Sequence, residues 1–146
     1  MSIGARVFVG PSAVICADEP GPDGTVEPVL VLERANIQDG VTVHAPGGFR
    51  VVIGKGSSLA RGAVVHGPCL VGDDCFIGFN SVVFKASLGE GVIVMHQSLV
   101  EGVDVPAGMC VPSMTAVTAD KDVSRLGPPG LELVEFARGS ATPMLV

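Results

Sequence analysis

The feature that most constrains the fold of this chain is a small aliphatic residue that recurs every six residues through most of its length. One interval shortens to five residues at Leu88, and glycine often follows the aliphatic residue. A period of six fits neither the helical period of about 3.6 residues nor a simple series of hairpins. It is typical of a solenoid built from hexapeptide repeats. The longest unbroken run comprises Ile53, Leu59, Val65, Val71, Ile77 and Val83.

Each hexapeptide is expected to form one flat side of a three-sided coil, as a short strand followed by a turn. Three sides make a rung of about 18 residues, and rungs stack at ~4.8 Å, the ordinary spacing of β-strands. The aliphatic residue points inward and stacks on its equivalents. The composition suits such thin layers, because 47% of the residues are apolar, only 4% are aromatic, and Trp and Tyr are absent. We therefore predict an all-β parallel β-helix, and a β-sandwich would not give such equal intervals.

Two breaks in the repeat, Glu19–Glu27 and Pro46–Arg50, are interpreted as loops inserted at corners of the coil. Repeat proteins often place binding sites at such insertions. The coil is expected to occupy residues 1–114. Residues 115–146 then form a short C-terminal helical segment and tail of the same domain, with Ala119–Leu126 and Leu131–Arg138 as helices and Gly139–Val146 as the tail. Such a helix is expected to pack along one side of the coil.

Charge and cysteine content narrow the classes of partner. The formal net charge is −6, and only nine Lys and Arg residues are scattered along the chain. We therefore expect no nucleic-acid partner and no acidic membrane surface. No apolar run approaches the roughly 20 residues of a membrane span, and no signal-peptide pattern is visible. The four cysteines lack a CxxC spacing, so we expect reduced thiols in a cytoplasmic protein.

Three motifs carry a resemblance to a known family. The stretch Asn36-Ile-Gln-Asp-Gly-Val-Thr-Val-His44 is similar to the NxQDGxxxH motif of gamma-class carbonic anhydrases. Val65-His-Gly-Pro-Cys69 resembles their second histidine motif, and the stretch from Val105 to Ser113 resembles their coil-closing segment. The likeness covers nearly the whole chain and is nearest to the branch with the archaeal enzyme and the carboxysome scaffold proteins. It implies a left-handed parallel β-helix that assembles as a homotrimer.

The resemblance also implies a metal site. Members of the family hold one zinc ion at each subunit interface, with two histidines from one subunit and a third from its neighbour. The zinc-bound water becomes hydroxide and attacks CO2. The same-subunit ligands match His44 and His66 of this chain. Each follows an inward aliphatic residue, so both are expected to leave the coil at the same corner position.

The third ligand position of the family is occupied by Arg61. A guanidinium stays protonated and offers only donors, so it cannot ligate zinc. We therefore expect zinc to be sub-stoichiometric or absent, with a weaker two-histidine site completed by water or Asp39 as the remaining metal option. Across the trimer interface, Arg61 could form an ion pair with Asp39 or Asp18. Together with the two histidines it could instead hold a small anion such as bicarbonate.

Other catalytic positions of the family are partly kept. Gln38 and Asp39 match its motif, and Asp18 and Glu19 match the acidic pair before the first loop. Cys16 replaces an arginine of the family. A thiolate suits zinc, but the matching position is not a ligand position in the family. Gly47 stands where the archaeal branch has its proposed proton-shuttle glutamate.

Two further features are given structural interpretations. His96 interrupts the aliphatic series and is interpreted as a surface or interface residue. The segment Gly54-Lys-Gly-Ser-Ser58 only faintly resembles a phosphate-binding loop and is interpreted as a turn between hexapeptides.

These observations lead to two functional hypotheses. In the first, the chain is a gamma carbonic anhydrase homologue with a degenerate zinc site, weak or inactive in catalysis, that serves as a trimeric assembly or binding module with a protein partner in a larger assembly. In the second, it is an active carbonic anhydrase with an unusual ligand set. An acyltransferase shares the repeat but not the histidine motifs, and is disfavoured. The chain also begins about where the second coil of typical members would start.

Overall fold

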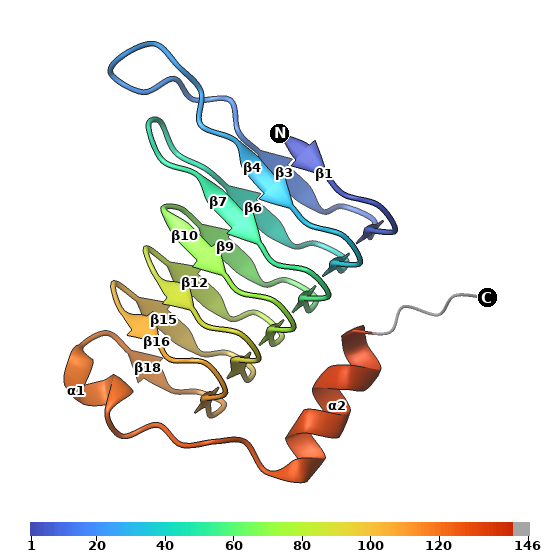
Figure 1. Ribbon diagram of the computed structural model, residues 1–146, viewed down its shortest axis with the longest axis vertical. Coiled ribbons are helices and arrows are strands. Elements are labelled where there is room, and N and C mark those ends of the chain that lie inside the picture. The colour runs from blue at the N-terminus through green and yellow to red at the C-terminus, as the bar shows by residue number, and fades with distance from the viewer. Residues whose placement is uncertain (142–146) are drawn as a thin grey trace.

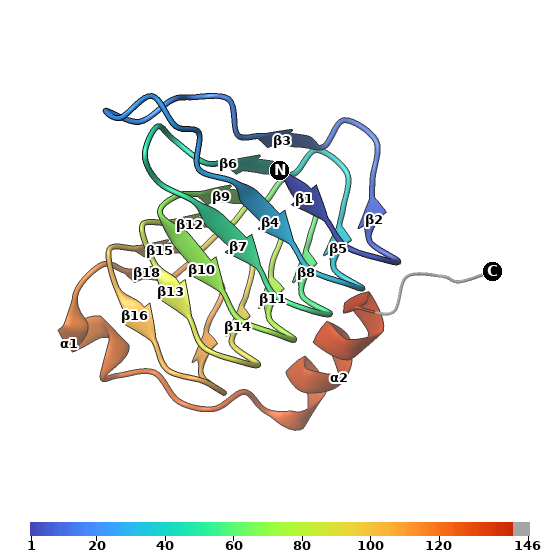
Figure 2. The same cartoon turned by 45° about the horizontal axis from the view of Figure 1, so that its top comes forward.

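The computed structural model describes residues 1–141 of the 146-residue chain, and it is a parallel β-helix with three flat sides (Figures 1 and 2). Each side is a six-stranded parallel sheet. Sheet A contains β1 (Ser2–Ile3), β4 (Val29–Val31), β7 (Val51–Ile53), β10 (Cys69–Val71), β13 (Ser87–Leu88) and β16 (Asp104–Val105). Sheet B contains β2 (Phe8–Val9), β5 (Asn36–Ile37), β8 (Ser58–Leu59), β11 (Phe76–Ile77), β14 (Ile93–Val94) and β17 (Cys110–Val111). Sheet C contains β3 (Val14–Cys16), β6 (Thr42–His44), β9 (Val64–His66), β12 (Val82–Phe84), β15 (Leu99–Glu101) and β18 (Ala116–Val117).

The hexapeptide period places one aliphatic residue of every strand inside the coil. On sheet B, Ile37 pairs in register with Leu59, and Leu59 pairs with Ile77 one rung further on. All three side chains are fully buried. Such ladders run down each side and fill the interior with aliphatic side chains, so no aromatic anchor is needed in the centre. The predicted fold class, a left-handed parallel β-helix, is confirmed.

The corner between sheets B and C requires a left-handed backbone. Residues at equivalent positions in successive rungs have positive φ there, as at Gly40 (φ 68°), Gly62 (φ 74°) and Asn80 (φ 55°). Glycine and asparagine tolerate this region better than other residues do. The turn leaves the residue just before it on the outside of the corner. Asp39 and Arg61 both occupy that outer position.

The coil extends to Val117, because β18 continues the aliphatic series, whereas the sequence interpretation ended it at residue 114. The C-terminal segment then contains α1 (Asp120–Val123) and α2 (Leu131–Ala141). Both helices were expected, but α1 is shorter than the predicted span of 119–126. Helix α2 continues beyond Arg138, and residues 142–146 of the predicted tail lie outside the described part of the chain.

Helix α2 packs along sheet B, as Figure 2 shows. Its residues Leu133, Val134 and Ala137 contact a small cluster on the outer face of that sheet. The ring of Phe136 meets Phe76 edge to face at 5.4 Å between centroids. This contact covers an outward-facing apolar patch that water would otherwise face. The cluster comprises Ala60, Phe76, Ile93, Met95 and Cys110.

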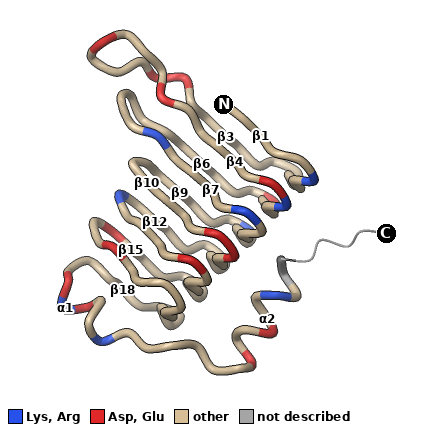
Figure 3. Tube along the Cα trace, viewed as in Figure 1, with Lys and Arg blue, Asp and Glu red and all other residues tan. Residues whose placement is uncertain are grey.

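The charged residues lie on the outside of the coil. Figure 3 shows Lys and Arg residues of the described chain spread among Asp and Glu residues along its length. None of the helices within residues 1–141 combines the length and the apolar character needed to cross a membrane.

Candidate functional site

A column of potential metal ligands runs along the edge of sheet C. Cys16, His44 and His66 are the last residues of β3, β6 and β9, and they pair in register from one rung to the next. Each comes directly after an inward aliphatic residue, so all three side chains point outward. Consecutive positions in such a column are one strand spacing apart, about 4.8 Å. The parallel register therefore brings together residues that are 22 to 28 positions apart in the sequence.

The two histidines contact each other directly. His44 Nδ1 lies 3.0 Å from His66 Nε2, within hydrogen-bonding distance, and the ring centroids are 4.8 Å apart. The other nitrogen of His66 lies 3.0 Å from the carbonyl oxygen of Gly67. The ring of Phe84, next in the same column, meets His66 edge to face at 5.0 Å. The sequence interpretation placed both histidines at one corner position, and the structure brings them together there.

Both inserted loops contribute to this edge of the coil. Glu19, in the first loop, places Oε1 3.1 Å from Nε2 of His44. Its other carboxylate oxygen accepts a hydrogen bond from the backbone N–H of Gly47 in the second loop, at 3.2 Å. Glu19 thus links the two loops and holds one side of the His44 ring.

Cys16 and Asp18 complete the cluster beside His44. The thiol of Cys16 donates a hydrogen bond to Asp18 Oδ1 at 3.0 Å. This hydrogen bond, together with partial burial and the charges of Asp18 and Glu19, raises the pKa of Cys16. The same hydrogen bond is the main reason that the pKa of Asp18 is lowered. One ligand atom each from Cys16, Asp18 and His44 lies within 4.8 Å of the others, which is compact enough to hold a metal ion.

Arg61 stands at a different corner, between sheets B and C. Its Nε lies 3.6 Å from Asp39 Oδ2, one rung away in the same column. Both side chains are substantially exposed, at 66% for Arg61 and 47% for Asp39, so this ion pair contributes little to stability. The pair lies within one subunit, whereas the sequence interpretation placed it across an interface. Gln38 precedes Asp39 at the end of the same side of the coil.

The contacts of Cys16 and Glu19 with this cluster were not anticipated from the sequence. A signal for Cys16 was present, because it follows the inward residue Ile15 as His44 follows Val43. For Glu19 the signal was its match to the acidic pair of the family, and the repeat itself gave none. It belongs to an irregular loop, whose path only the tertiary structure determines.

Two other features lie away from this cluster. His96 stacks on Phe79 at 4.4 Å between centroids, and its Nδ1 accepts a hydrogen bond from the Phe79 backbone N–H. Burial lowers the pKa of His96. The segment Gly54–Ser58 forms a turn, in which Lys55 lies 3.7 Å from Glu33.

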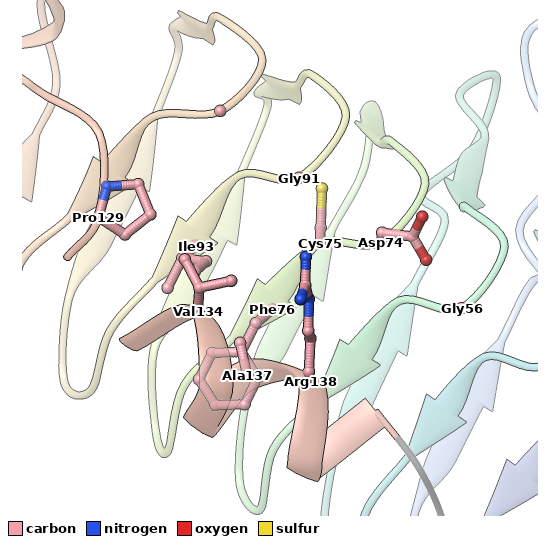
Figure 4. Close-up of a pocket in the computed structure, with 11 residues that line it drawn as sticks. Gly56, Asp74, Cys75, Phe76, Gly91, Ile93, Pro129, Val134, Ala137 and Arg138 are labelled. Carbon is pink, nitrogen blue, oxygen red and sulfur yellow. The ribbon is translucent and has the colours of Figure 1, made fainter. Parts of the chain in front are cut away.

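A cavity of about 570 Å³ lies between α2 and sheet B, on another side of the coil from the histidines. Figure 4 shows Arg138 extending from α2 toward Asp74 and Cys75 in this cavity. Burial raises the pKa of the Cys75 thiol to about 11, so it is not a reactive thiolate.

Comparison with known proteins relates the chain to a family. The bacterial transferase hexapeptide model, which describes six repeats, matches residues 50–85. The carboxysome assembly protein CcmM of a Nostoc species is 43% identical over 134 residues, which are 85% of this chain and 23% of that protein. The carbonic anhydrase of Methanosarcina thermophila is 34% identical over 145 residues, which are 86% of this chain and 56% of the enzyme. The chain belongs to the hexapeptide-repeat family and is homologous to gamma carbonic anhydrases and CcmM.

The chain matches only part of each of these two relatives. The chain spans about half the length of the Methanosarcina carbonic anhydrase and about a quarter of CcmM. Among solved structures, a hexapeptide transferase family protein from Anaplasma phagocytophilum superposes with a TM-score of 0.70. It covers 95% of this chain and 74% of its own, at 24% identity, and supports the fold alone.

The donors present do not fit the three-histidine zinc that the resemblance implies. Two imidazoles are in place, because His44 and His66 approach to 3.0 Å. The residue that the family motif matches to the third ligand position is Arg61, whose guanidinium has no lone pair for a metal and carries a permanent positive charge. The chain therefore supplies two of the three imidazoles that such a zinc ion requires.

Proposed function

We propose that this chain is a gamma carbonic anhydrase homologue with a degenerate zinc site, and that it acts as a trimeric assembly or binding module. The proposal rests on two histidines that contact each other at 3.0 Å, and on the arginine that the family motif matches to the third ligand position. A complete site of this type holds the metal with three protein ligands and leaves one position for water. Two histidines bind a metal more weakly and control its geometry less.

The relatives support an assembly role. The Nostoc relative is a carboxysome assembly protein, and this chain is 43% identical to it over most of its own length. We infer that the chain has a protein partner in a larger assembly. In the trimer, Arg61 would approach the histidines of a neighbouring subunit, where its positive charge would hold a small anion such as bicarbonate rather than a cation.

The proposal predicts little or no carbonic anhydrase activity. In stopped-flow hydration of CO2, the purified chain is expected to turn over at least about a thousandfold more slowly than the ~10⁶ s⁻¹ that a zinc-bound hydroxide supports in a complete site. Addition of excess zinc is not expected to restore the rate. Rapid, zinc-dependent hydration by the unmodified chain would contradict the proposal.

The trimer is tested by mass in solution. Light scattering coupled to size exclusion is expected to give about 44 kDa, which corresponds to three chains of 14.8 kDa. The family's metal site lies between subunits, so a monomer at micromolar concentration would remove the basis for placing Arg61 against a neighbour's histidines. Measurement over a range of protein concentrations separates a stable trimer from weak association.

One observation favours the alternative of an active metalloenzyme. Cys16, Asp18 and His44 offer three different metal-binding groups on one subunit, close enough to share an ion. An enzyme built on this unusual ligand set would hydrate CO2 without Arg61 taking part. The stopped-flow measurement distinguishes it from the assembly module.

A further inference from the structure

A second set of potential metal ligands lies within one subunit. The third family ligand is lost at Arg61, but Cys16 occupies the next position above His44 in the column on sheet C. Arg61 lies at the corner between sheets B and C, whereas Cys16 is the last residue of a sheet C strand and lies at the next corner. Among the described residues, a thiol, a carboxylate and an imidazole come together where Asp18 lies beside the column on sheet C.

The distances suit a small divalent ion. In a tetrahedral zinc site, sulfur lies about 2.3 Å and nitrogen or oxygen about 2.1 Å from the metal, so neighbouring ligand atoms are about 3.5 Å apart. Cys16 Sγ and Asp18 Oδ1 are 3.0 Å apart, and the ligand atoms of Cys16, Asp18 and His44 all lie within 4.8 Å. The three side chains are exposed or partly exposed, so rotation about their bonds is enough to bring ligand atoms from within 4.8 Å of one another to about 3.5 Å.

The charges also suit such an ion. A thiolate and a carboxylate together carry two negative charges, which match those of a divalent cation. Glu19 lies 3.1 Å from His44 Nε2 and accepts a hydrogen bond from Gly47, so the imidazole has a carboxylate partner of the kind that orients metal-bound histidines. Within one subunit, Arg61 is paired with Asp39 at another corner. In the proposed trimer, a neighbour's Arg61 would approach His44, and the negative charges of the Cys16 thiolate, Asp18 and Glu19 outweigh its single positive charge.

We propose that Cys16, Asp18 and His44 form a binding site for a thiophilic divalent cation, such as zinc or cobalt, within a single subunit. Glu19 and His66 contact the two ring nitrogens of His44, so coordination by His44 replaces one of these two contacts. When the metal–sulfur bond forms, the Cys16 thiol proton passes to solvent and the hydrogen bond to Asp18 is replaced by coordination. The site differs from the interfacial site of the family, because it uses neither position 61 nor a neighbouring subunit.

The test is a titration of the full-length chain with Co²⁺ under reducing conditions. Coordination by Cys16 is expected to produce a thiolate-to-cobalt charge-transfer band in the near ultraviolet, saturating at one ion per subunit. The Cys16→Ser variant is expected to lose the band and to bind Co²⁺ at least about tenfold more weakly. Asp18→Asn is expected to keep the band and to weaken binding by a similar factor.

Matched controls separate this site from the rest of the chain. Cys110→Ser changes a thiol on sheet B and is expected to keep the full band. Asp23→Asn changes a carboxylate that accepts hydrogen bonds from Thr25 in the first loop, and is expected to leave the affinity unchanged. Circular dichroism checks that each variant folds. If Cys16→Ser does not fold, His44→Gln and Asp18→Asn test the same site.

The result can overturn the proposal in three ways. Cobalt binding without a thiolate band would assign the metal to the histidines alone. A band that survives Cys16→Ser would place it on another cysteine. Failure to bind Co²⁺ in millimolar excess would show that the cluster is not a metal site. None of these outcomes depends on CO2 hydration or on trimer mass, so the proposed function and the metal site can fail separately.

Discussion

In the Cys16→Ser background, replacing Arg61 with histidine is expected to raise the zinc content of the purified protein from well under half an ion to about one ion per subunit. The physical reason is the donor set. His44 and His66 already lie 3.0 Å apart, and the substitution exchanges a permanent cation for a third imidazole. Metal analysis of protein purified without chelator, before and after dialysis against zinc, measures the change.

A control substitution, Arg125→His, and the Cys16→Ser background show which residues bind the added zinc. Arg125→His adds a histidine near the C-terminal end of the coil and is expected to leave the zinc content at the wild-type level. The Cys16→Ser background removes any contribution from the thiol, so zinc gained there by Arg61→His belongs to the three histidines. If Arg61→His gains no zinc in either background, position 61 does not meet the histidines of a neighbour. CO2 hydration by this variant is expected to stay slow, because Cys16 and Gly47 also differ from the family.

The Gly54→Ala substitution is expected to lower the free energy of unfolding by about 3 kcal/mol or more. A Cβ built at Gly54 would lie 2.6 Å from the backbone nitrogen of Asp73 and closer still to the carbonyl of Gly72. Both are backbone atoms of the next rung, so no side chain can rotate away. The rungs would have to separate, which weakens the hydrogen bonds of the parallel ladder. Urea unfolding followed by circular dichroism measures the loss.

Gly127→Ala is the matched control for this prediction. A Cβ at Gly127 would have no heavy atom within 4 Å among the described residues, and its stability is expected to change by no more than about 0.5 kcal/mol. Wild type and variants are compared at equal chain concentration, because association with identical subunits stabilises the folded state. A Gly54→Ala protein as stable as the control would show that the rungs tolerate a wider spacing than parallel strands normally adopt.

Most of the fold follows from local sequence. The spacing of Ile53, Leu59 and Val65 fits a coil with flat sides of six residues each, because every sixth residue then faces the interior. The predicted helix at Leu131–Arg138 corresponds to α2. The apolar patch on the outer face of sheet B, which α2 covers, was not predicted from the sequence. The coil reached Val117 rather than residue 114, since Ala116–Val117 continues a series that the sequence interpretation had ended one strand too early.

Part of the candidate site could be predicted from the sequence, and part required the tertiary structure. The sequence by itself determined that His44 and His66 share a corner position, because each follows an inward aliphatic residue, and that Arg61 stands where a metal ligand was expected. Cys16 carries the same signal, but only the tertiary structure decided that it lies beside His44 and that Glu19 reaches His44. The register across the first inserted loop sets the place of Cys16. The path of Glu19 depends on contacts between two irregular loops, which carry no repeat from which a position can be read.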